Sequence, residues 1–256
     1  MFFHQWRYGV GAMATLLTVC TGAFAVPLTF SLDESSSQLT MQGAFANFGT
    51  VAQDPPDNTS LTSSVSGNLL IDVDNVSTPT TIQFLGGGAV IANSGDWLPD
   101  VGGETEGTPP TNLAPANFGL FLEVTALQTE GWAAFRDMVA APISNPLPVS
   151  GSVFGSAPAI QFASGSYDFN LISGLGDSVG NDSFAGATVP NMAADGTYQV
   201  DGDLITLTMP VDTTFGGDLV IQLTGNLVAT AVVPEPSAAV LAISAFGLLG
   251  AVRRRR

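Results

Sequence analysis

Short segments in which apolar and polar residues alternate recur along the chain between residues 27 and 232. Alternation of this kind places apolar side chains on one face of a β-strand, and the Gly, Ser and Thr residues between the segments are typical of turns. Near the end, Asp201-Gly202 separates two such segments and predicts a tight hairpin turn. The pattern predicts an all-β fold, an antiparallel β-sandwich. A β-helix is the alternative, but no fixed period supports it.

One segment has a different spacing. In Glu130–Ala140, the residues Trp132, Phe135 and Val139 would lie on one side of a helix, and a proline follows at position 142. We therefore expect one short helix that covers an open end of the sandwich. In that helix Arg136 would lie one turn from Trp132, within reach of a cation–π contact.

A short pattern with a central glycine occurs three times, around Gly67, Gly151 and Gly225. Glycine inside a strand often marks a bulge or a close approach of another backbone. We expect the chain to bulge or bend at these positions, where the two sheets meet.

Residues 1–25 predict a signal peptide. Arg7 precedes an apolar run that continues to Cys20, and Ala23 and Ala25 are the small residues that signal peptidase accepts. We expect cleavage between Ala25 and Val26.

Residues 237–252 carry no charge and predict a transmembrane helix. At about 1.5 Å per residue, such a helix would span most of a hydrocarbon core of about 30 Å. Positive charge next to a membrane helix stays cytoplasmic, which would leave everything before Pro234 outside. The positive residues here are Arg253, Arg254, Arg255 and Arg256.

The helix is preceded by Pro234, Glu235 and Pro236, and the two prolines favour an extended backbone. These three residues, the apolar helix and the arginine cluster together resemble the PEP-CTERM sorting signal of exported bacterial proteins, a tail sometimes labelled an ice-binding protein C-terminal domain. The resemblance covers residues 234–256 only. It implies that an exosortase-type membrane protease recognises the motif and cleaves nearby, which passes the protein to the cell surface or extracellular matrix. It also implies a bacterium with a Gram-negative type of envelope, usually one that makes exopolysaccharide.

Segment 26–233 would then be the exported ectodomain. It contains 21 acidic side chains and one basic side chain, Arg136, so its net charge is −20. Nucleic acid is excluded as a partner, because phosphate contacts need clustered Lys and Arg. The segment has no His, Cys or Lys. This excludes thiol nucleophiles, Ser-His-Asp triads and the usual zinc sites, and leaves carboxylate chemistry or a cation held by oxygen ligands.

Asp72, Asp74 and Asn75 are the candidate metal ligands. The two aspartates lie two residues apart on a predicted strand and would share its polar face. Oxygen ligands suit calcium, which is the one cofactor that the sequence suggests. Asn75 also fits an ordinary turn, so the alternative is that these residues form no site.

The sequence favours a non-catalytic surface or matrix protein that is associated with exopolysaccharide. One alternative is a calcium-dependent glycan-binding module. Another is a secreted carbohydrate-active hydrolase, which would need a carboxylate pair across a cleft. No spacing singles out such a pair among Glu104, Glu106, Glu123 and Glu130, so we expect no catalytic residue.

Overall fold

The computed structural model describes residues 26–45, 49–50, 62–93, 116–124, 128–155, 158–174, 178–216 and 219–233. These residues form strands and no helix, and every pairing between strands is antiparallel, so the predicted all-β antiparallel fold is confirmed at this level. The strands are β1 (Val26–Leu32), β2 (Gln38–Phe45), β3 (Gly49–Thr50), β4 (Thr62–Val73), β5 (Thr81–Phe84), β6 (Ala89–Ala92), β7 (Phe118–Val124), β8 (Thr129–Ile143), β9 (Leu147–Ser150), β10 (Val153–Phe154), β11 (Ala159–Ser173), β12 (Ser178–Ser183), β13 (Thr188–Val189), β14 (Gly196–Asp201), β15 (Leu204–Gly216) and β16 (Leu219–Val232).

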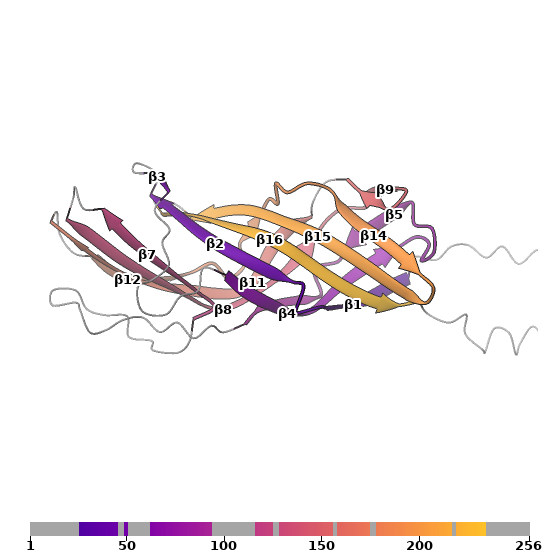
Figure 1. Ribbon diagram of the computed structural model, residues 1–256, viewed down its shortest axis with the longest axis horizontal. Helices are drawn as coiled ribbons and strands as arrows, with labels where there is room; N and C mark the ends of the chain where they lie inside the picture. Colours follow the sequence, from indigo (N-terminus) through magenta and orange to yellow (C-terminus); the bar gives the residue numbers. More distant parts are fainter. Residues whose placement is uncertain are drawn as a thin grey trace, which may run out of the picture.

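Hydrogen bonds join these strands into one sheet, and thirteen of them follow the order β12-β11-β8-β6-β4-β5-β9-β10-β14-β15-β16-β2-β3. Off this path, β7 pairs with β8, β13 with β11, and β1 with β4 and β16. The sheet curves over on itself, because β1 and β2 each pair with both β4 and β16. The longest strands run along the long axis of the described part (Figure 1). Because the sheet curves over on itself, one of its faces is turned inward along this axis.

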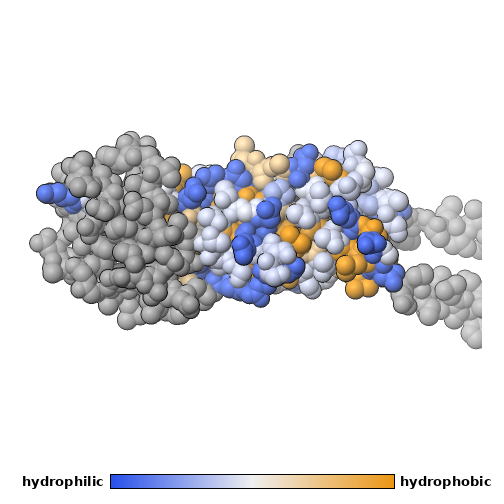
Figure 2. Space-filling view, viewed as in Figure 1, coloured by the Kyte–Doolittle hydropathy of each residue, from blue (hydrophilic) through white to orange (hydrophobic). Residues whose placement is uncertain are grey.

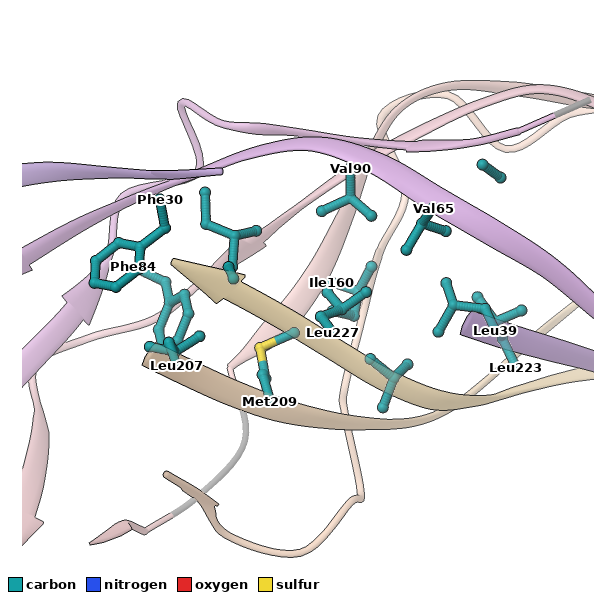
Figure 3. Close-up of a cluster of buried hydrophobic side chains, with 14 of the residues drawn as sticks. Phe30, Leu39, Val65, Phe84, Val90, Ile160, Leu207, Met209, Leu223 and Leu227 are labelled. Carbon is teal, nitrogen blue, oxygen red and sulfur yellow. The ribbon is translucent and has the colours of Figure 1, made fainter. Parts of the chain in front are cut away.

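A single large apolar core fills the space between the facing strands. Figure 3 shows Val65 and Val90 pointing from one side toward Leu223 and Leu227 on the other. The alternation predicted from the sequence is seen in β15, where every second residue from Ile205 to Thr213 is buried. Burial of this kind stabilises the fold by about 25 cal/mol for each Å² of apolar surface removed from water.

The predicted helix over Glu130–Ala140 is wrong, because these residues lie inside strand β8. Strand β8 pairs with β7, β11 and β6, and its residues from Ala133 to Arg136 are all buried. A strand covered on both faces has a continuous apolar run and lacks visible alternation, so chance spacing can imitate a helix. Pro142, expected to follow the helix, is paired with Ile160 inside the sheet.

The expected contact between Arg136 and Trp132 depended on helical spacing, which a strand does not have. Arg136 is 2% exposed, and its Nη1 donates a hydrogen bond to Oδ2 of Asp168 on the neighbouring strand β11. The single basic residue of segment 26–233 is therefore part of a partly buried ion pair between β8 and β11.

Candidate functional site

The candidate calcium ligands lie where strand β4 ends. Asp72 is in β4, opposite Gln83 of β5 on one side and Pro27 of β1 on the other. Asp74 and Asn75 follow in the turn that leads to β5. The structure therefore places the three residues at one end of the strand, in one turn region.

The turn itself uses the oxygens of Asp74 and Asn75. Oδ1 of Asp74 accepts hydrogen bonds from the backbone N–H groups of Thr80 at 2.9 Å and Thr81 at 3.1 Å, and its Oδ2 accepts one from Oγ1 of Thr80. Oδ1 of Asn75 accepts from the N–H groups of Ser77 and Thr78. The contacts of Asn75 are typical of an Asx turn, and those of Asp74 close the longer loop between β4 and β5, so both side chains already have a structural role.

The pKa of Asp74 is below its ordinary value. Burial alone would raise it, but the hydrogen bonds from Thr80 and Thr81 stabilise the carboxylate and outweigh that effect. Asp74 therefore stays charged at neutral pH while it closes the turn.

Asp72 differs from its two neighbours, because its Oδ1 is buried and accepts no hydrogen bond from any described residue. A buried carboxylate oxygen without a donor is costly unless water or a cation supplies a partner. Within the described ranges, however, no three His, Cys, Asp or Glu side chains are grouped as a metal site would need.

The remaining carboxylate candidates are only partly described. Backbone register places Glu123 of β7 opposite Glu130 of β8, while Glu104 and Glu106 lie outside the described residues.

A cavity of about 30 Å³ in the core is lined by apolar residues such as Val65, Ile160 and Leu227. It lacks the converging polar groups that orient a ligand.

A second region of interest is the end of the molecule where β16 finishes. The turn Asp201-Gly202-Asp203 joins β14 to β15 there, as the sequence predicted, and Gly202 has a φ of 60°. The backbone N–H of Val233 donates a hydrogen bond of 2.8 Å to the carbonyl oxygen of Asp203. The folded sheet therefore extends to Val233. Because β1 is antiparallel to β16, β1 begins at this same end.

Two exposed apolar side chains lie beside that turn. Leu204 begins β15 and is paired with Val232, the last residue of β16. Leu204 is 46% exposed and Val232 is 70% exposed. Figure 2 shows apolar surface toward this end of the described part. We call the surface formed by Asp201, Asp203, Leu204 and Val232 the exit surface.

Comparison with known protein families identifies the segment that begins at this surface. The model of the PEP-CTERM protein-sorting motif matches residues 232–256. The chain carries a PEP-CTERM sorting motif. The match confirms the resemblance proposed from the sequence, and it begins at Val232, inside strand β16. No curated protein and no solved structure matches the chain.

Most residues predicted to take part in sorting and export lie outside the described residues. These are the cleavage residues Ala23 and Ala25, the motif Pro234, Glu235 and Pro236, and the arginines Arg253, Arg254, Arg255 and Arg256. Val26, the expected mature N-terminus, is the first residue of β1. The predicted transmembrane segment at 237–252 also lies outside, and within the described ranges no helix is long and apolar enough to cross a membrane.

Proposed function

We propose that this protein is an exported, non-catalytic protein of the cell surface or extracellular matrix, associated with exopolysaccharide. The observation that carries the proposal is the PEP-CTERM motif at residues 232–256, joined directly to a folded β domain. The motif implies an exported, membrane-anchored precursor that an exosortase, a membrane protease, processes. The ectodomain is the part that remains after processing.

Two features of the ectodomain support a non-catalytic role. It lacks the His, Cys and Lys side chains on which most nucleophilic and acid–base sites depend. The cavity in its described core has an apolar lining. Association with exopolysaccharide is supported by the sorting motif, which usually occurs in bacteria that make such polymers.

The sorting part of the proposal can be tested with Glu235→Ala. This substitution removes the motif's charge without touching the described fold, so the precursor should accumulate at full length in the membrane fraction. The unaltered protein should appear outside the cell without its arginine tail. Asp195→Ala, which removes an exposed carboxylate before β14, is the matched control and should be processed normally. Release of Glu235→Ala at the normal size and rate would contradict the proposal.

The second candidate is a calcium-dependent glycan-binding module, and the buried Oδ1 of Asp72 favours it. A calcium ion at Asp72 and Asp74 would bind only the folded state and would raise the melting temperature in millimolar calcium. The double variant Asp72→Asn/Asp74→Asn should lose this effect. Sodium at the same ionic strength is the control, and an equal shift from sodium would reject the site.

A glycan array with and without calcium, followed by turnover assays on any hit, tests binding and catalysis together.

A further inference from the structure

The sorting motif is attached to the folded domain without a spacer. The match to the motif begins at Val232, which is still paired with Leu204. The next residue, Val233, is hydrogen-bonded to Asp203. The recognised sequence therefore begins inside the sheet, and Pro234 comes immediately after it.

This attachment limits how far the motif can lie from the fold. An extended chain advances at most about 3.3–3.6 Å per residue, so Pro236 lies within roughly 11 Å of Val233. A protease that holds residues 234–236 in its active site is far larger than this distance. It must therefore come close to the end of β16 and to the turn beside it.

The surface at that point is unusual for this molecule. Leu204 and Val232 are two of the five large hydrophobic residues that are exposed in the described ranges, and they are cross-strand partners. Together they leave apolar surface in water beside the motif, and a bound partner would remove that surface from water. Asp201 and Asp203 flank the pair, and both are exposed.

The charges beside the apolar pair help to decide whether a lipid bilayer or a protein binds the exit surface. An anionic bilayer surface would repel the carboxylates of Asp201 and Asp203, which lie beside the apolar pair with no described basic residue near them in sequence. A protein that binds the motif can cover the apolar pair and place polar or basic groups against the two carboxylates. The observations therefore favour a protein over a lipid surface.

We propose that the exit surface (Asp201, Asp203, Leu204 and Val232) is a docking surface for the exosortase-type protease that processes the tail. This inference rests on the proposed function, because it assumes that such a protease reads the motif. Specificity would then come from the motif and from the folded end of the ectodomain together. A correctly completed sheet would be part of what the protease recognises.

Leu204→Ser tests the proposal without changing any residue of the matched motif. Leu204 is about half exposed, so its loss from an interface should slow processing roughly fivefold, which corresponds to about 1 kcal/mol. The matched control is Ile91→Ser, because Ile91 is 42% exposed and lies in β6, away from the turn. The full-length chains are expressed with an exosortase-type protease, and the processed fraction is followed by pulse-chase. Equal rates for Leu204→Ser and Ile91→Ser would overturn the docking surface.

Two further measurements keep the test decisive if Leu204→Ser folds poorly. An eight-residue Gly-Ser insertion between Val233 and Pro234 leaves the described fold and residues 234–256 unchanged but moves residues 234–256 away from the exit surface, and it should also slow processing severalfold. A photo-crosslinking amino acid at position 204 should form an adduct with the protease, and the same group at position 91 should not. Unchanged processing with the insertion, or adducts from position 204 with lipid alone, would overturn the proposal.

Glu235→Ala, run in parallel, separates failure of this inference from failure of the proposed function. If Glu235→Ala blocks processing while Leu204→Ser does not slow it, the motif is read but the exit surface is not used. If Glu235→Ala is processed normally, the proposed function itself fails, and with it the docking surface.

Discussion

At the scale of single residues, the ion pair between the buried Arg136 and the partly buried Asp168 should contribute strongly to stability. Arg136 is 2% exposed, and burial lowers the pKa of its guanidinium, while Asp168 and Asp137 raise it. Removing one partner of a buried ion pair leaves a poorly solvated charge in the interior. The ion pair therefore adds to the backbone pairing of β8 with β11, and either side chain alone would be left with a poorly solvated charge.

We expect Asp168→Ala to lower the free energy of unfolding by about 3 kcal/mol. For a domain of this size, that corresponds to a fall in melting temperature of roughly 6–12 °C. Thermal unfolding of segment 26–233 measures the change, and Asp195→Ala should stay within about 0.5 kcal/mol of the unaltered protein. The double variant Arg136→Met/Asp168→Leu removes both charges and should recover much of the loss. A double variant no more stable than Asp168→Ala would show that the buried charge is not the cause.

Asp74 predicts a specific dependence of stability on pH. Its pKa is lower in the folded state than in the unfolded chain, so its contribution to stability is present above about pH 4 and is lost as the pH falls through the folded-state value. Asp74→Asn keeps an oxygen acceptor for Thr80 and Thr81 but cannot titrate. The difference in melting temperature between the unaltered protein and Asp74→Asn should therefore be largest near neutral pH and should shrink below about pH 4. A difference that does not change with pH would contradict this role.

At the scale of elements, the sequence predicted the features that local patterns determine. Strands such as β15, with one buried face, show clear alternation, and the Asp201-Gly202 turn follows from its composition. Strand β8 was mistaken for a helix because consecutive residues from Ala133 to Arg136 are buried, so both faces of the strand are covered, and that is a property of the whole fold. The exit surface could not be predicted for the same reason. Leu204 and Val232 become neighbours only through the register of β15 and β16.

The three glycines of the repeated pattern do not all lie in the same kind of structure. Gly67 in β4 and Gly225 in β16 each lie where the strand changes partner between β2 and β1, and their φ angles are 112° and 151°. The register runs through both glycines without a bulge, so the positive φ angles are the local departure that the structure shows. Gly151 instead lies in the short turn between β9 and β10, with a φ of 64°. The same local pattern therefore serves a close backbone approach in two places and a turn in the third.

This difference predicts unequal effects of alanine. A Cβ at Gly225 would lie 2.0 Å from the backbone oxygen of Gln38, and backbone cannot move aside easily. At Gly151, no atom lies within 4 Å of the added carbon, so only the left-handed backbone conformation opposes it. We expect Gly151→Ala to cost about 1–2 kcal/mol. Gly225→Ala should cost at least about 4 kcal/mol or prevent folding. Chemical denaturation of both variants measures these values, and equal costs would show that the contact with Gln38 is relieved.

At the scale of the whole molecule, the strand order decides which end faces the membrane. β16 ends where the sorting motif begins, and β15 and β16 lead away from that point along the long axis of the described part (Figure 1). Thr214, near the far end of β15, is eleven residues from Asp203. At about 3.3 Å per residue, the two positions are separated by roughly 36 Å. A precursor anchored by its tail should therefore hold the Asp201–Asp203 turn close to the bilayer and residue 214 far from it.

Fluorescence energy transfer to an acceptor dye on the bilayer surface tests this orientation. Segment 26–233 contains no cysteine, so Gly202→Cys and Thr214→Cys each give a single labelling site in the exported domain. Gly202 has a φ of 60°, so Gly202→Cys should cost about 1–2 kcal/mol. The turn and Thr214 are both exposed, so neither label should disturb the core. With the Glu235→Ala precursor in membranes, transfer should be strong from position 202 and weak from position 214. Equal transfer from both positions would mean that the domain lies flat on the membrane. In that case the exit surface would not be presented at the bilayer in the way that docking of a membrane protease requires.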